Sequence, residues 1–249
     1  MKTALILGHP GHELRIFRFL EIHKPIVYVL TDGSGNNNGQ SRILSTLKVL
    51  EATGCCPGSV LGKFSDREIY DMMLKQQDHI FKDLIEEIEI DLKKQGIERI
   101  VGDACEGFNP THDLCRYMIN IIAQKNDLPN YDFLLEGAPH LCPERLKSKA
   151  IWMHLSEADF ERKLTAAKNY PELTFDLEET LKKHGKAPFM IECLRPIEDP
   201  TVLKTWKTPI PHYESYALEK VQKGKYQEII SFEKQLYPLT KKLQTLCVS

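Results

Sequence analysis

Short apolar runs that alternate with amphipathic segments constrain the fold of this 249-residue chain more than any other feature. A short apolar run that ends at a glycine or a polar turn is typical of a buried strand. Apolar residues at spacings of three and four are typical of a helix that covers a sheet. The expected strands are Lys2–Gly8, Pro25–Thr31, Arg99–Asp103, Tyr131–Glu136 and Ala187–Cys193.

Helical patterns fill the segments between these strands. A capping box at Ser65–Glu68 opens one helix, and Pro110 takes the first helical position of another, directly after Asn109. Strands that alternate with helices predict an α/β protein with a Rossmann-like three-layer fold and a mainly parallel sheet. The expected helices are Leu14–Leu20, Ser41–Ala52, Ser65–Gln95 and a segment from Pro110 through Ile122.

The pattern changes after Leu194. Arg195–Pro211 is rich in proline and threonine, which is typical of a surface loop. Glu214–Gln244 has a helical pattern, and its apolar stripe would pack either on the same domain or on a partner subunit of a homo-oligomer. We therefore expect a core over residues 1–195, with a loop and a C-terminal helical extension packed on it over residues 196–249.

The composition bears on partners and location. The formal net charge of −2 gives no basic surface of the kind that binds nucleic acid. No apolar stretch approaches the roughly 20 residues of a membrane-spanning helix. The chain begins with a strand pattern rather than a signal peptide, so a cytoplasmic location is expected. The 7 cysteines show no zinc-ribbon spacing, which predicts reduced thiols.

Three histidines follow two of the expected strands. His9 and His12 lie in the turn after the first strand, and His112 lies in the first turn of the helix after Arg99–Asp103. In open α/β sheets, ligands bind at the carboxyl ends of the strands. Three imidazoles that meet there would leave one position of a tetrahedral zinc site open, as catalytic zinc requires. The alternative for His112 is an ordinary surface residue at the start of a helix.

Four short motifs occur in a characteristic order. They are Gly8-His9-Pro10-Gly11-His12-Glu13, Leu30-Thr31-Asp32-Gly33, the segment Gly107–His112, and the segment Lys147–Glu157. Their order resembles the signature of the LmbE-like deacetylases, a family that includes the N-acetylglucosaminyl-phosphatidylinositol de-N-acetylases (PIG-L). The resemblance covers about residues 1–195. It implies a zinc-dependent hydrolase that removes an N-acetyl or similar acyl group from an amino sugar or a related small glycoconjugate.

The first motif departs from the family pattern at two positions. Gly11 stands where the family has the aspartate that acts as general base, and His12 stands where it has an aspartate ligand. The family's ligand triad therefore corresponds to His9, His12 and His112, and the implied cofactor is Zn²⁺ or another divalent transition metal. An imidazole in place of a carboxylate makes the site more positive, which favours a low pKa for water on the metal.

Proton transfer must then involve a residue other than Gly11. Asp113 is the first candidate because it directly follows His112, and Glu13 and His154 come next. Each has a structural alternative: Glu13 and Asp113 could orient the imidazoles, and His154 could be a core residue. The candidates for substrate binding are Asp32, Asn109 and Glu106.

Two other functions compete with hydrolysis. A catalytically repurposed family member would keep the fold as a sugar- or metabolite-binding module, and Gly11 and Thr111 favour this alternative because aspartates are expected at both positions. A nucleotide-binding protein would share the topology, but the first loop is not G-x-G-x-x-G and the chain contains no P-loop. Turnover of N-acetylated amino sugars separates the first two functions, and metal content separates the hydrolase from the nucleotide-binding protein.

Overall fold

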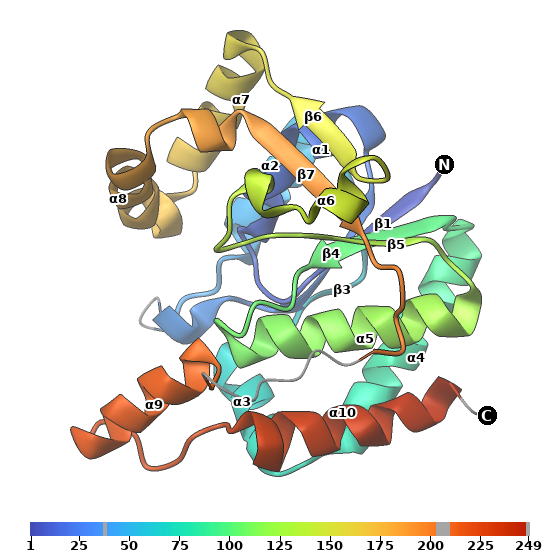
Figure 1. The fold of residues 1–249 in the computed structure, drawn as a ribbon, viewed down its shortest axis with the longest axis vertical. Helices are drawn as coiled ribbons and strands as arrows, with labels where there is room; N and C mark the ends of the chain where they lie inside the picture. Colours follow the sequence, from blue (N-terminus) through green and yellow to red (C-terminus); the bar gives the residue numbers. More distant parts are fainter. Residues whose placement is uncertain (37–38, 203–209, 248–249) are drawn as a thin grey trace.

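The computed structural model describes residues 1–36, 39–202 and 210–247, which form a seven-stranded sheet between layers of helices (Figure 1). The strand order is β3-β2-β1-β4-β5-β7-β6. The strands are β1 (Thr3–Leu7), β2 (Ile26–Thr31), β3 (Cys56–Phe64), β4 (Arg99–Asp103), β5 (Asn130–Phe133), β6 (Ile151–His154) and β7 (Ile191–Pro196). The first five in space pair in parallel, whereas β7 is antiparallel to both of its neighbours. The expected mainly parallel, three-layer α/β fold is confirmed.

Helices cover both faces of the sheet (Figure 1). One core cluster joins the sheet to α3, α4, α5 and α10, and the other joins it to α1, α2 and α7. Because β1 lies in the middle, Ala4 and Ile6 belong to the first cluster while Leu5 and Leu7 belong to the second. The helices are α1 (Phe17–His23), α2 (Ile43–Thr53), α3 (Asp66–Leu74), α4 (Asp78–Gln95), α5 (Pro110–Asn126), α6 (Glu144–Lys147), α7 (Glu157–Lys168), α8 (Thr174–His184), α9 (His212–Gln222) and α10 (Tyr237–Gln244).

The two edge strands, β3 and β6, were not predicted from the sequence. β3 contains Pro57, Gly58 and Gly62, residue types that are depleted in strands and tolerated mainly at sheet edges. β6 is four residues long and none of its side chains is buried. Neither strand has the continuous buried apolar run that identified the central strands.

Several predicted boundaries are wrong. The single helix expected over Ser65–Gln95 is two helices, because the backbone at Gln76 is left-handed with φ of 55°. β7 begins four residues later than expected, since Ala187–Phe189 forms a short 3-10 helix, and it continues to Pro196. The loop expected over Arg195–Pro211 therefore begins later, and residues 203–209 of it lie outside the described residues.

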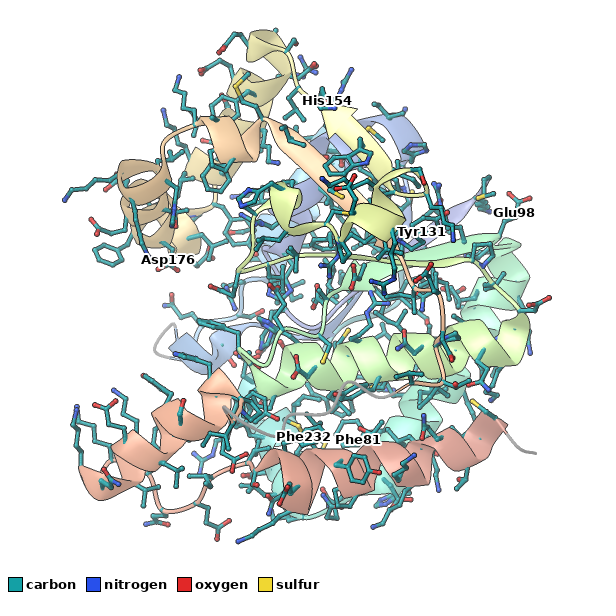
Figure 2. All side chains as sticks on the ribbon, in the orientation of Figure 1. Phe81, Glu98, Tyr131, His154, Asp176 and Phe232 are labelled. Atoms are coloured by element: carbon teal, nitrogen blue, oxygen red, sulfur yellow. The ribbon has the colours of Figure 1, made fainter. Side chains whose placement is uncertain are left out.

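The C-terminal segment packs on its own domain. It forms α9 and α10 rather than one continuous helix, and its buried side chains Phe232, Leu236, Leu239 and Leu243 join the cluster under α4 and α5. Figure 2 shows Phe232 beside Phe81 of α4. This settles where the apolar stripe packs, while a domain boundary at residue 195 stays a prediction. None of the described helices is both long enough and apolar enough to cross a membrane.

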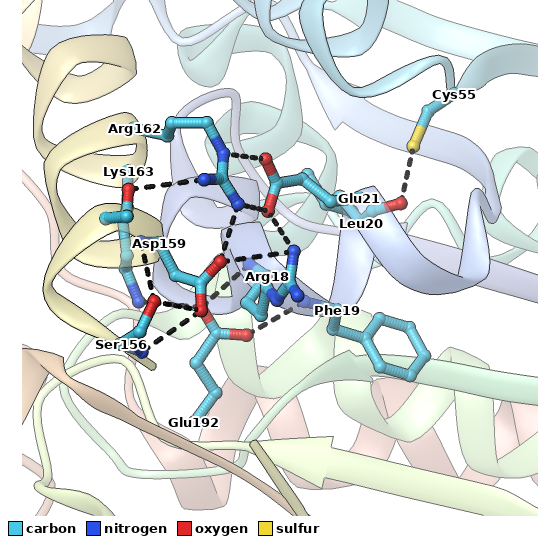
Figure 3. Close-up of polar contacts among 11 residues, drawn as sticks. Arg18, Phe19, Leu20, Glu21, Cys55, Ser156, Asp159, Arg162, Lys163 and Glu192 are labelled. Carbon is cyan, nitrogen blue, oxygen red and sulfur yellow. Dashed lines mark hydrogen bonds and ion pairs between the residues drawn. The ribbon is translucent and has the colours of Figure 1, made fainter. Parts of the chain in front are cut away.

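A buried ion pair fixes α7 against the sheet (Figure 3). Lys163 Nζ lies 2.9 Å from Glu192 Oε1 and also donates to the Arg15 carbonyl at 2.8 Å. The Glu192 carboxylate accepts the backbone N–H groups of Arg18 and Phe19 at 2.9 and 3.0 Å, where α1 begins. Burial lowers the pKa of Lys163, and the contact with Glu192 opposes that shift. The pair therefore holds α7 and the start of α1 against β7.

Candidate metal centre

Three histidines converge at the carboxyl ends of β1 and β4. His9 follows β1, His12 opens a short 3-10 helix (His12–Ile16), and His112 is the third residue of α5. Each offers one ring nitrogen to a common space, and these three atoms lie within 4.8 Å of one another. The ring centroids are 4.5 to 5.4 Å apart. The structure thus brings together the three residues that the sequence predicted as metal ligands.

Two glycines shape the turn that carries His9 and His12. The Gly8 N–H donates to Asp103 Oδ2 at 2.7 Å, and a Cβ on Gly8 would lie only 3.1 Å from that oxygen. Gly11 has φ of 100°, a left-handed conformation that side chains rarely adopt. A Cβ there would also lie 2.6 Å from Leu173 Cδ1. The local backbone and packing therefore favour glycine at position 11.

Asp103 orients His12. Its carboxylate, which is fully buried at the end of β4, lies 2.9 Å from His12 Nδ1. A carboxylate accepts hydrogen bonds, so this contact assigns a proton to Nδ1 and leaves Nε2 as the lone-pair nitrogen. Histidines that bind metals commonly donate their other ring nitrogen to a carboxylate in this way.

Asp66 has the corresponding position beside His9. Its Oδ1 lies 3.3 Å from His9 Nε2, and its Oδ2 accepts the Gly35 N–H at 2.7 Å. The other ring nitrogen, His9 Nδ1, is buried and has no hydrogen-bond partner among the described residues. A buried nitrogen without a partner is costly unless a ligand satisfies it. His9 Nδ1 is therefore the ring atom that would face a metal.

Burial keeps two of the imidazoles neutral. It is the largest cause that lowers the pKa of His9 and, more strongly, of His112, and the nearby charges of His12 and Arg42 lower both further. Neutral imidazole is the form that binds a metal, and it suits zinc and neighbouring first-row ions. The orphaned nitrogen and the three-histidine donor set together fit a divalent transition metal.

A large cleft opens from the histidines. Its volume is about 1970 Å³, and its walls include α3, α8 and the segment after α9. Figure 1 shows α8 and α9 on the same side of the molecule, one on each side of the strand ends. Polar groups near the histidines are Arg42, Asp66, Asn109 and Glu136, while Phe160, Leu164, Leu173, Leu177 and Leu181 supply an apolar wall.

Asp113 and Glu13 make backbone contacts instead of facing this cleft. Asp113 Oδ1 accepts the N–H groups of Glu106 and Gly107 at 3.0 and 3.1 Å. Glu13 accepts the Gly11 N–H at 2.7 Å and the Thr46 hydroxyl at 2.8 Å, and burial raises its pKa. Neither residue is among the described residues that line the cleft. The catalytic roles expected for them stay predictions. The contacts that they make stabilise the backbone turns around them.

Of the remaining predicted site residues, only Asn109 is among the described residues that line the cleft. His154 is exposed at the end of the edge strand β6 and does not line the cleft (Figure 2). Asp32 accepts the Ser34 N–H at 2.9 Å, and Glu106 accepts backbone N–H groups of the loop after β5, including that of Leu135 at 2.6 Å. Asn109 caps α5 and does line the cleft. Their predicted roles are otherwise untested.

Sequence reasoning missed Asp66, Arg42 and Phe108 as cleft residues. Asp66 directly follows the capping residue Ser65, and an acidic residue is common in the first turn of a helix, so the sequence indicated only a structural role for it. Arg42 is half-buried at the start of α2, and its Nε donates to the Gly33 carbonyl at 2.8 Å. A charged residue at the end of a glycine-rich loop was the available signal for Arg42.

Comparisons with known proteins show likeness at the level of the fold. No protein-family model and no curated protein sequence matches this chain. A deacetylase of teicoplanin biosynthesis has a TM-score of 0.56 at 17% identity, covering 79% of this chain and 97% of its own. The deacetylase of A40926 pseudoaglycone has a TM-score of 0.55 at 17% identity, covering 83% and 99%. A zinc-inhibited form of teicoplanin deacetylase has a TM-score of 0.52 at 15% identity, covering 79% and 97%. The chain shares their fold.

Proposed function

We propose that this protein is a metal-dependent hydrolase that removes an N-acetyl or similar acyl group from an amino sugar or a related small glycoconjugate. The observation that carries the proposal is the convergence of His9, His12 and His112 at the base of a large cleft. Structural neighbours described as deacetylases of teicoplanin and of A40926 pseudoaglycone support the reaction class.

His9 Nδ1, His12 Nε2 and one nitrogen of His112 would hold the metal, for which Zn²⁺ is our first choice. When bound, such an ion polarises an amide carbonyl and lowers the pKa of water. Asp103 keeps His12 in the tautomer that leaves Nε2 available, and Asp66 Oδ1 lies beside His9 Nε2 on the side away from Nδ1. The protein itself contributes three ring nitrogens that lie close together in a buried part of the fold.

Arg42 and Glu136 supply the charges that a bound acetamido group would meet. Arg42 lines the cleft close enough for its charge to lower the pKa of both His9 and His112. We assign it to hold a substrate oxygen. Glu136 also lines the cleft, and partial desolvation followed by repulsion from Glu106 raises the pKa of this largely accessible carboxyl group. A carboxyl group with a raised pKa can donate a proton to a leaving amine, so we assign this step to Glu136 rather than to Asp113.

The test is acetate release by the purified chain from N-acetylglucosamine and its glycosides, with the metal content measured in parallel. We expect bound metal near one equivalent, loss of activity on chelation and its return with Zn²⁺. The His12→Ala variant should lack metal, whereas His79→Ala, at an exposed histidine of α4, should retain it. Equal metal in both variants would contradict the proposed ligand set.

One observation favours the second candidate, a sugar-binding module. The position of the family's general base is Gly11, and Leu173 occupies the space that a side chain there would need. A protein that binds metal and N-acetylated sugars but releases no acetate would support this function instead. Glu136→Gln separates the two, because it should lower kcat in a hydrolase and leave binding by a module unchanged.

A further inference from the structure

An aromatic stack connects the cleft to the C-terminal extension. Phe108 lies in the loop between β4 and α5, lines the cleft and is 40% exposed. Its ring is nearly parallel to that of His212, with centroids 4.7 Å apart and an interplanar angle of 5°. His212 in turn stacks on Tyr216 of α9 at 6.0 Å. Phe108 and the three histidines line the same cleft.

Buried contacts hold the two sides of this stack together. The N–H of Tyr213 donates to the Gly107 carbonyl at 3.2 Å, and the Tyr213 ring is buried in the core. Glu214 binds the chain beyond α9, since it accepts the Phe232 N–H at 2.9 Å and the Ser231 hydroxyl at 3.1 Å. The loop of Phe108 is therefore joined to the first turn of α9 by a backbone hydrogen bond and a buried ring, and Glu214 joins that turn to the segment before α10.

We propose that a pyranose ring of the substrate lies on one face of the Phe108 phenyl ring, and that His212 of the C-terminal extension supports the opposite face of that phenyl ring. This inference rests on the proposed function and specifies how its substrate is held. A pyranose has a face of C–H groups that can pack on an aromatic ring, while its hydroxyls need polar partners. Asn109 and Asp66, which also line the cleft, supply such partners.

The charge and exposure of the stack favour a sugar over a purely apolar group. His212 and Tyr216 are exposed, and Lys220 Nζ lies 4.7 Å from the Tyr216 ring centroid. His212 and Lys220 place hydrogen-bond donors beside the aromatic rings of Phe108 and Tyr216. The sugar ring is thus assigned to the α9 side of the cleft.

The experiment measures binding of phenyl N-acetyl-β-glucosaminide to the full chain by saturation-transfer NMR, alongside metal content and kcat and KM for acetate release. Phe108→Ala should weaken binding by about tenfold and His212→Ala by about threefold, because an aromatic contact is worth roughly 0.5–1.5 kcal/mol. Phe108→Tyr and His212→Phe, which keep a ring, should stay close to wild type. Phe175→Ala, at an aromatic residue of α8 that is 74% exposed, is the control and should change nothing.

We expect these changes in KM and in the dissociation constant, with kcat and metal content preserved. Unchanged binding in Phe108→Ala and His212→Ala would overturn the inference, as would loss of metal from either variant. Saturation received mainly by the phenyl group instead of the sugar protons would overturn it too. If binding follows the expected pattern but no acetate is released, the hydrolase proposal fails and the sugar surface stands.

Discussion

The histidine cluster and the aromatic stack adjoin the same cleft but are held in different ways. The cluster stands on the ends of two central strands, and the carboxylate that orients His12 is fully buried. The stack joins the Phe108 loop to α9, and its rings are largely exposed. The cluster is therefore built into the core, whereas the stack depends on how the C-terminal segment is attached. Changes at the two regions should have separable effects on metal binding and on sugar binding.

The largest effect is expected when the buried carboxylate of the cluster is changed. Asp103→Asn removes the charge that accepts from both His12 and the Gly8 N–H, so metal affinity should fall about 10- to 100-fold. The measurement is a competition titration with a zinc chelator. Asp71→Asn, at a carboxylate that lines the cleft and pairs with Lys75 rather than with a histidine, is the matched control. Equal affinity in the two variants would show that Asp103 does not position His12.

An aspartate at position 11 should damage the turn. Gly11→Asp places a side chain at φ of 100° and within contact of Leu173, so we expect a loss of about 1–3 kcal/mol in the free energy of unfolding and no gain in activity. Denaturant titration gives the stability. Gly11→Ala combined with Leu173→Ala removes the contact and isolates the backbone strain, and Leu173→Ala combined with Gly11→Asp relieves the contact. A Gly11→Asp variant that is stable and more active would mean that the wild-type site is a deacetylase site that lacks its general base.

Glu136→Gln is expected to act on the reaction alone. Because the neutral amide cannot donate a proton as a carboxyl group does, kcat should fall while KM and metal content stay near wild type. The pH profile should also lose its alkaline limb, since a group with a raised pKa must stay protonated to act as the acid. An unchanged pH profile would show that another residue of the cleft donates the proton.

The smallest effect is expected at the attachment of α9. Glu214→Gln weakens its two contacts with Ser231 and Phe232, which should cost about 1 kcal/mol and lower Tm by about 2–4 °C. Sugar affinity should fall slightly with it, while metal affinity should not change. Glu219→Gln, an exposed residue of the same helix paired with Lys223, is the control and should leave Tm unchanged. A change in metal affinity in Glu214→Gln would show that the two regions are coupled.

The sequence determined the central part of the fold and the convergence of the three histidines. The buried apolar runs of β1, β2 and β4 follow from local composition, and in a parallel sheet their carboxyl ends must share one edge. His9, His12 and His112 therefore meet because each directly follows a predictable element. The edge strand β3 was missed because Pro57 and Gly58 mask its pattern, and a strand is established there only by pairing with β2.

Only the tertiary structure decided which carboxylates serve the histidines. Glu13 and Asp113 are adjacent to ligand residues in the chain, yet they hold backbone turns. Asp103 instead orients His12, and Asp66 lies beside His9; these carboxylates are 91 and 57 positions away from their partners. In a tight turn, the side chains of adjacent residues point in different directions, so a neighbour in the chain does not contact the imidazole. The carboxylate that meets the distance and angle of a hydrogen bond comes from another element that packs beside the histidine. Sequence spacing alone carries no information about that alignment.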